Sequence, residues 1–368
     1  MTKFSKFVLA AIVCEMTAAW AHAEDAKPAA PSLADVIAAS GLTVSGYVAA
    51  SYSHSSGYPF NIHQFDTKHD SFQLDQAGLS VAYQPKAGFG GLVDIIAGED
   101  ARILHAAEDS NDNSFDVRQA FIQYATGSLT VMAGKMLTLA GAEVINPTLN
   151  TNFSRSLLFF DCEPLTHTGI RATYALSDAF SVTAGINNGW NSTSTSNGSK
   201  TGEIGFGWTP DKTFSWTVQG YVGKTDADFG GNDSTRTLID TVLTYNATSA
   251  LTLILNVDVD KWKDALGPDQ DAEWYGVAGY LNYAINDQWR VSVRVEYVDD
   301  QDGFLTGVQQ KLKEGTLTFG YSPTKNVELR FEGRIDKAGE ETFFKSRTAQ
   351  APDTDGLTGF AIQGVYKF

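Results

Sequence analysis

The sequence predicts an all-β fold, a closed antiparallel transmembrane β-barrel of about 16 strands. Apolar and polar residues alternate with period two from Gly41 to the end of the chain. Short and long connections alternate between the predicted strands, and no run of apolar residues after the N-terminal segment could form a spanning helix. A mean hydropathy of −0.17 agrees with this fold, because only every second residue of a spanning strand meets lipid.

The N-terminus has the pattern of a secretory signal over residues 1–23. Lys3 and Lys6 precede an apolar run over 7–13, and Ala21 to Ala23 form a small-x-small cleavage site. Residues 24–40 are then expected to be a periplasmic leader. Ser32 is placed there to cap a short helix that ends near Ser40. The β-barrel is predicted over residues 41–368.

The strands are recognised by their alternation. In 288–298, for example, Val291, Val293 and Val295 alternate with Arg290 and Arg294. The predicted strands are 42–53, 72–83, 91–99, 115–126, 128–137, 165–175, 179–190, 200–209, 213–223, 236–246, 250–261, 272–285, 288–298, 309–322, 326–336 and 357–368.

The connections between these strands fall into two classes. Short turns such as 126–127, 177–178 and 286–287 alternate with long loops. The long loops are 54–71, 100–114, 138–164, 191–199, 224–235, 262–271, 299–308 and 337–356. Short periplasmic turns and long extracellular loops are typical of outer-membrane barrels, and an even strand number leaves both termini in the periplasm.

Alternation alone also fits a soluble β-sandwich with its apolar face inside. Three features favour lipid outside and water inside. The chain is long and almost free of predicted helices, aromatic residues gather at strand ends as in an interfacial girdle, and the polar faces carry rows of charges of both signs. The terminal Phe368 closes the last predicted strand, as in outer-membrane proteins.

Several stretches resemble the OmpL-like putative outer-membrane β-barrel porin family. They are 45–48 (SGYV), 98–101 (GEDA), 133–135 (AGK), 152–159 (NFSRSLLF), 164–169 (PLTHTG), 187–190 (NNGW), 274–280 (WYGVAGY) and 296–300 (EYVDD). They are spread over nearly the whole mature chain, and the most specific is 152–159. The resemblance implies an outer-membrane porin but no particular substrate. Residues 160–163 are more acidic than is expected of the family, which leaves the charge preference of the pore open.

A barrel of 16 strands leaves an aqueous channel unless something narrows it. Segment 138–164 is the longest loop and contains the apolar run 157–160, which an exposed loop rarely presents to water. We therefore expect it to fold inward as a constriction, with a surface or subunit-contact loop as the alternative. Strand parity directs a row of arginines into the lumen, where they oppose the acids of the loop or pair with neighbouring acids. The predicted constriction and lumen residues are Glu143, Arg155, Asp161, Glu163, His167, Arg171, Arg290, Arg294, Arg330 and Arg334.

Other function classes receive little support. A net charge of −16 argues against nucleic-acid binding. The chain has no hydrolase elbow, zinc-protease motif or phosphate-binding loop, so neither an enzyme nor a cofactor is predicted. The outer loops are acidic, and their carboxylates either are merely solvated or share divalent ions with lipopolysaccharide.

The expected function is passive diffusion of small polar solutes and ions through the outer membrane. Two alternatives remain, a channel specific for a sugar or an anion and a closed structural or adhesive barrel. Four tryptophans fall on the apolar face of their predicted strands: Trp190, Trp208, Trp216 and Trp289. This favours an interfacial girdle over a row of aromatic rings that would guide a sugar through the lumen. The expected partners are outer-membrane lipid, lipopolysaccharide and the permeating solutes, and a homotrimer is predicted.

Overall fold

The computed structural model describes residues 32–59, 62–109, 113–195, 198–224 and 234–368. The predicted signal and the first part of the leader lie outside the described residues. The chain divides into two units, Met1–Ser40 and Gly41–Phe368. In the first unit the predicted short helix is present as α1 (Leu33–Ser40). The Ser32 hydroxyl accepts the Asp35 N–H at 3.2 Å and donates to the Asp35 carboxylate at 2.6 Å, which caps the first turn. No described helix is both long and apolar enough to cross a membrane.

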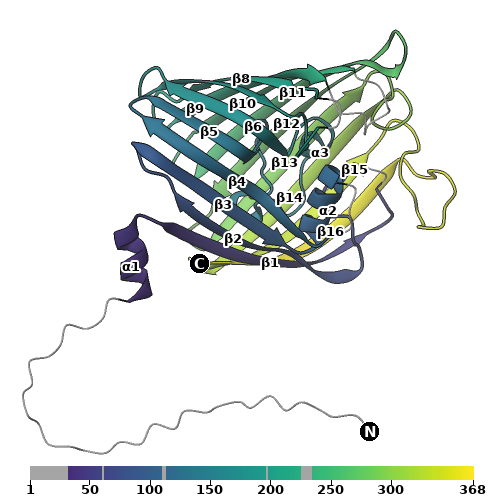
Figure 1. Ribbon diagram of the computed structural model, residues 1–368. Helices are drawn as coiled ribbons and strands as arrows, with labels where there is room; N and C mark the ends of the chain where they lie inside the picture. Colours follow the sequence, from purple (N-terminus) through teal and green to yellow (C-terminus); the bar gives the residue numbers. More distant parts are fainter. Residues whose placement is uncertain (1–31, 60–61, 110–112, 196–197, 225–233) are drawn as a thin grey trace, which may run out of the picture. The chain divides into compact units, whose positions relative to one another are not determined.

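The second unit is a closed ring of 16 antiparallel strands, as the sequence predicted (Figure 1). Each strand pairs with its neighbours in sequence, and β1 pairs with β16 to close the ring. The strands are β1 (Thr43–Ser55), β2 (Ser71–Tyr83), β3 (Gly88–Ala97), β4 (Phe115–Thr126), β5 (Leu129–Leu137), β6 (Thr166–Ala175), β7 (Phe180–Asn187), β8 (Thr201–Trp208), β9 (Phe214–Lys224), β10 (Thr235–Asn246), β11 (Leu251–Gly267), β12 (Gln270–Ala284), β13 (Trp289–Asp300), β14 (Gln310–Thr324), β15 (Val327–Lys337) and β16 (Gly356–Lys367).

The two faces of the wall differ as the alternation requires. On β13, Arg294 is fully buried while the next residue, Val295, is 57% exposed. The same contrast holds on β15 between Arg334, which is buried, and Ile335, which is exposed. Because outward residues are apolar and inward residues are polar, the wall presents an apolar surface to lipid and a polar surface to the lumen.

The structure departs from the sequence prediction at the connection between β11 and β12. The predicted loop 262–271 is mostly strand, because β11 continues to Gly267 and β12 begins at Gln270. Gly267 and Asp269 have positive φ values of 138° and 60°, which turn the chain within two residues. The alternation in fact continues through Trp262, which lies inward like Asp260.

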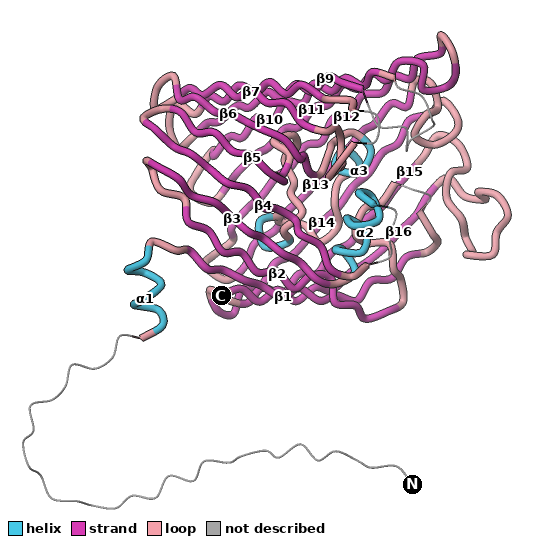
Figure 2. The backbone as a smooth tube through the Cα atoms, viewed as in Figure 1, coloured by secondary structure: helices cyan, strands magenta, loops and turns pink. Residues whose placement is uncertain are grey.

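Two helices were not predicted from the sequence. The predicted loop 100–114 contains α2 (Glu99–Asp109), which packs on β2, β3 and β4 and buries Ala101 and Leu104. The apolar run in segment 138–164 forms α3 (Leu157–Asp161), capped by the Ser156 hydroxyl, which accepts the Phe159 N–H. A 3-10 turn, η1 (Pro147–Leu149), precedes it. Figure 2 shows α2 and α3 near one another among the strands, and Leu104 and Phe159 of these helices belong to one apolar cluster.

Segment 138–164 leaves the ring at β5 and rejoins it at β6. Its α3 packs on β12 and β13, and its η1 packs on β16. In a ring of 16 strands, β13 is eight strands from β5 and therefore faces it across the barrel. The segment thus reaches from one side of the wall to the opposite side.

Candidate functional site

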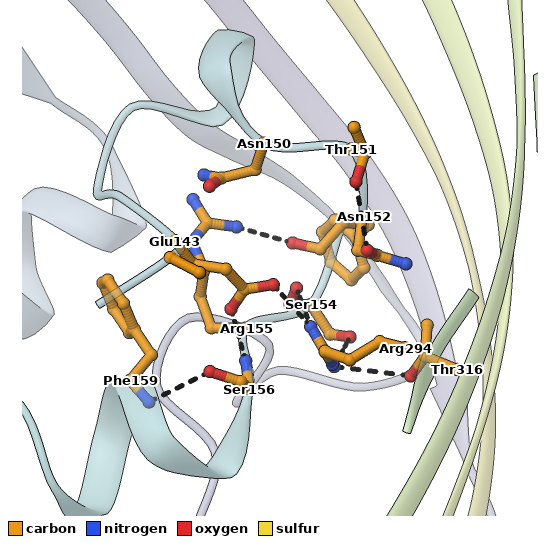
Figure 3. A network of polar contacts seen from close by, with 12 residues as sticks. Glu143, Asn150, Thr151, Asn152, Ser154, Arg155, Ser156, Phe159, Arg294 and Thr316 are labelled. Atoms are coloured by element: carbon orange, nitrogen blue, oxygen red, sulfur yellow. Dashed lines mark hydrogen bonds and ion pairs between the residues drawn. The ribbon is translucent and has the colours of Figure 1, made fainter. Parts of the chain in front are cut away.

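The central contact of the site joins segment 138–164 to β13. Arg294 donates from Nη1 to Glu143 Oε1 at 2.8 Å and from Nη2 to Ser154 Oγ at 3.0 Å (Figure 3). The same guanidinium lies 2.9 Å from Glu296 and 3.2 Å from Glu314 on the wall. Full burial of Arg294 requires such compensation, because an unpaired internal charge is costly.

Two arginines of β15 hold the backbone of the segment. Arg330 Nη2 donates to the carbonyls of Pro147 and Asn150, each at 2.9 Å. Arg334 Nη1 donates to the carbonyl of Arg155 at 2.8 Å, and its other nitrogens pair with Asp336. These bonds satisfy backbone carbonyls that the irregular chain cannot pair within itself.

Wall acids perform the complementary task by accepting N–H groups of the segment. Glu332 on β15 accepts from Phe153 at 2.6 Å and from Ser154 at 2.9 Å. Glu296 on β13 accepts the Leu157 N–H at 2.8 Å, at the start of α3. Bonds to a charged acceptor contribute about 1.5–3 kcal/mol each, so the segment is fixed to the wall by ionic groups.

Arg155, one of the predicted site residues, braces the segment internally. Its guanidinium donates to the carbonyls of Val144, Phe153 and Ile145 at 3.0, 2.8 and 2.9 Å. It also lies over the rings of Phe65 and Phe159. Arg155 is therefore buried inside the fold of the segment, with its charge directed at backbone oxygens.

The other predicted acids do not face arginines of the predicted set. Asp161 is buried near Asp300, and burial and that neighbouring charge raise its pKa well above the usual range. Glu163 lies with Asp240 and Asp258, and neither Asp161 nor Glu163 has an ion pair within the described part of the chain. Of the three predicted loop acids, Glu143 alone meets a predicted wall arginine.

The remaining predicted residues lie on the wall. His167 on β6 is stacked on Tyr221, and its Nδ1 lies 3.2 Å from the carbonyl of Gly189. Arg171, also on β6, pairs with Glu203 at 2.7 Å. Arg290 on β13 pairs with Glu328, which also pairs with Arg330. Arg171 and Arg290 therefore have acidic partners two strands away in the ring, and Arg330 has its partner on its own strand. Glu332, also on β15, is engaged by the segment instead.

Sequence reasoning missed an inward aromatic group near the end of the barrel where the long loops lie. The Arg236 guanidinium is 3.5 Å from the ring centre of Trp190 and 5.0 Å from that of Trp274, and it pairs with Asp260 at 3.0 Å. The interpretation of Trp190 as a girdle residue was wrong, because the residue follows β7 in a connection where strand parity no longer applies. Trp262 could have been found by extending the alternation of 250–260 by one step.

Cavities of different size lie on the two sides of the segment. Towards the short turns, one of about 310 Å³ is lined by Tyr47, Arg118 and Asn146, and one of about 280 Å³ by Asn150, Arg290 and Glu328. Further along β15, the pocket beside Glu332 and Arg334 has a volume of about 30 Å³. That is the space of about one water molecule.

A second connection, 56–70, closes this small pocket. His63 Nδ1 lies 2.8 Å from Asp66, and its Nε2 lies 3.2 Å from Asp336 on β15. Burial and Arg334 disfavour the charged imidazole, but Asp66 and Asp336 outweigh them and raise the pKa of His63 to about 9. His63 is therefore positively charged at neutral pH and ties the connection to the wall.

Comparisons with known proteins agree with this architecture. The family described as "Putative beta-barrel porin-2, OmpL-like" matches residues 41–368. No curated protein matches the chain.

Solved structures share the fold at low identity. The outer-membrane channel DcaP of Acinetobacter baumannii is 12% identical, with a TM-score of 0.62 over 89% of this chain and 97% of that one. An anion-selective porin from Comamonas acidovorans is 12% identical, with a TM-score of 0.61 over 89% and 99%. The trimer form of OmpT of Vibrio cholerae is 14% identical, with a TM-score of 0.60 over 89% and 99%.

Proposed function

Because this chain belongs to the OmpL-like β-barrel porin family, we propose that segment 138–164 forms the constriction of its pore. The chain is a porin of the bacterial outer membrane, crosses it with 16 strands and carries small polar solutes by passive diffusion. The observation that carries the proposal is the reach of the segment from β5 to β13, with Glu143 and Arg294 in contact at the far wall. A segment fixed across the lumen narrows it.

The cavity volumes support the same position for the constriction. Cavities of about 310 and 280 Å³ lie on the turn side of the segment, and the pocket at Arg334 has a volume of about 30 Å³. We place the narrowest part of the lumen beside Glu332 and Arg334, where both residues bond to the backbone of segment 138–164. The wall there is polar, which favours hydrated solutes over apolar ones.

A weak preference for cations follows from the charge distribution. Arg171, Arg290, Arg294, Arg330 and Arg334 each have a carboxylate within 4 Å. Glu163, Asp240 and Asp258 have no cationic partner among the described residues. The paired arginines thus add no net positive charge to the lumen, and the net charge of −16 on the chain favours cations.

The alternatives from the sequence receive less support. A sugar channel needs accessible aromatic faces, but Trp262 and Trp274 are buried in the side-chain core beside the wall. An anion channel needs unpaired lumenal cations, and the arginines named above are paired. A closed structural barrel remains the outcome to exclude by experiment.

We also propose a homotrimer embedded in outer-membrane lipid. The trimer form of the OmpT neighbour, which has the same fold, supports this assembly. The apolar outer wall supplies the surface for lipid, and the acidic outer loops supply carboxylates for ions shared with lipopolysaccharide. Cross-linking of the protein in native membranes should give a ladder that ends at three chains.

The constriction is tested by single-channel recording in planar bilayers. A variant in which residues 143–156 are replaced by a short Gly-Ser linker should give larger conductance steps than the wild type. Shortening the exposed connection between β15 and β16 over residues 345–352 is the matched control and should leave the steps unchanged. Equal steps in the folded 143–156 variant and the wild type would contradict the constriction.

The same recordings under a salt gradient test selectivity. A reversal potential with weak cation preference is expected. Anion preference would assign selection to the arginines. If the folded wild-type protein gave no conductance steps, the porin function would be contradicted and the closed structural barrel would be the remaining alternative.

A further inference from the structure

Three buried carboxylates from three separate elements converge inside the barrel. Asp240 on β10 and Asp258 on β11 are direct cross-strand partners, and Glu163 reaches them from the end of segment 138–164. One carboxylate oxygen from each residue lies within 4.8 Å of those of the other two. Like charges in direct cross-strand register destabilise a sheet, so this arrangement needs a compensating partner.

The compensating partner is not within the described protein. Asp240 and Asp258 are fully buried and Glu163 is 5% exposed. Both oxygens of Glu163, Oδ1 of Asp240 and Oδ2 of Asp258 have no hydrogen-bond donor among the described residues. Asn256 donates at 2.8 Å to Asp240 and at 3.4 Å to Asp258, and the backbone N–H of Gly141 also donates to Asp240. Four shielded carboxylate oxygens are thus directed into one space with no described donor from outside the cluster.

The backbone of segment 138–164 is shaped around this space. Ala142 donates its N–H to Asn256 Oδ1 at 2.7 Å, which fixes the segment beside β11. Gly141 has a φ of 88°, and a Cβ at this position would overlap the Glu163 carboxylate. Glycine is therefore required where the chain passes the carboxylate, and Glu163 is held in place.

From this geometry we infer that Glu163, Asp240 and Asp258 form a binding site for a hard divalent cation of the Ca²⁺ class. Carboxylate oxygens are the ligands that Ca²⁺ prefers, at about 2.3–2.6 Å, so oxygens on opposite sides of one ion lie up to about 5 Å apart. The observed spacing fits within that limit. Water or backbone carbonyls would complete the six to eight ligands that Ca²⁺ takes.

Protons are the competing way to neutralise the cluster. Burial and the charges of Asp240 and Glu143 raise the pKa of Glu163 well above its usual range.

The site is tested by calorimetric titration of Ca²⁺ into the chelator-treated, folded protein in detergent at physiological salt. The wild type should show one site per chain. Glu163→Gln and Asp258→Asn should each weaken binding at least tenfold. Asp287→Asn, at an exposed short turn, is the matched control and should leave binding unchanged.

Unfolding temperatures measured in chelator and in Ca²⁺ distinguish a cation-binding site from a cluster that only contributes to folding. In chelator the two amide variants should unfold at the same or a higher temperature than the wild type, because they lose charge repulsion. In Ca²⁺ the wild type alone should gain stability. Equal Ca²⁺ affinity in all variants, or no uptake by the folded wild type, would overturn the proposal.

A measurement on the wild type tests the site even if the variants do not fold. Crystals soaked in Mn²⁺ should show an anomalous scattering peak between the three carboxylates. Absence of this peak, with peaks confined to outer loops, would also overturn the proposal. None of these measurements depends on conductance. The proposed cation site and the proposed constriction can therefore be contradicted independently of each other.

Discussion

Arg294 on β13 and Glu143 on segment 138–164 form a 2.8 Å ion pair, although 151 residues separate them in the sequence. Arg294 is at the same time within 3.2 Å of Glu296 and Glu314. One buried cation therefore serves three carboxylates, and it joins the segment to the wall. Arg294 is therefore one of the residues that fix the position of the segment.

Replacing Arg294 by Met should destabilise the barrel and loosen the segment. The change leaves three carboxylates without their cation, and breaking a buried pair in this way costs about 3–5 kcal/mol. Urea unfolding followed by tryptophan fluorescence should show the loss, and single-channel currents should become noisier. Lys311→Met, at an exposed lysine on β14, is the control and should change stability by less than about 0.5 kcal/mol. Equal effects of the two substitutions would contradict the role of Arg294.

Glu332→Gln should weaken the hydrogen bonds that join β15 to segment 138–164. The carboxylate accepts from the backbone N–H groups of Phe153 and Ser154 and from the Thr318 hydroxyl at 2.7 Å, whereas a glutamine presents one oxygen and an NH2 group. The expected loss is about 1.5–3 kcal/mol, the contribution of a bond to a charged acceptor. Proteolysis within segment 138–164 should accelerate in parallel. Glu341→Gln, in an exposed loop, should leave both measurements at the wild-type values.

Gly141→Ala should displace the segment, because the added methyl group overlaps the Glu163 carboxylate and the positive φ disfavours alanine. The expected cost is about 1–3 kcal/mol, measured as a shift of the urea midpoint at unchanged slope. Gly333→Ala, on the outer face of β15 where no atom lies within 4 Å of the new carbon, is the matched control. If both glycines tolerate alanine equally, the close approach at Gly141 is not a constraint.

Stability should fall as the pH rises through the pKa of His63. That pKa is raised from 6.5 to about 9, so the imidazole takes up a proton on folding. The resulting stabilisation is complete below about pH 6.5 and is lost as the pH rises through about 9, with a total of about 3 kcal/mol. Unfolding midpoints between pH 6 and 10 should show this loss. His63→Gln should flatten the profile, whereas His54→Gln at an exposed position should retain it.

The strands were predictable because their signal is local. In a strand every second side chain shares a face, so the polar partners of Val291 and Val293 had to be inward whatever their neighbours were. The same parity assigned Arg290, Arg294, Arg330 and Arg334 to the lumen side, where Arg290 is half-buried and the other three are buried. The alternation of short turns with long loops set the order of the ring, because consecutive antiparallel strands pair through short connections.

The partners of these residues were not predictable in the same way. Asp161 and Glu163 were expected to oppose arginines, but they lie beside Asp300 and beside Asp240 and Asp258. Trp190 was placed on the wrong side because the strand that carries its parity ends at Asn187. In each case the residue lies in a connection, where no period relates sequence position to direction.

The sequence by itself determined the class of fold, the number of strands and the face on which most strand residues lie, because these follow from a repeat that is read within about ten residues. Only the tertiary structure decided that segment 138–164 crosses to β13, that its acids divide between Arg294 and an acidic cluster, and that α2 packs inside the wall. Those choices depend on which groups can pair across the lumen, and burial makes an unpaired charge too costly for most alternatives.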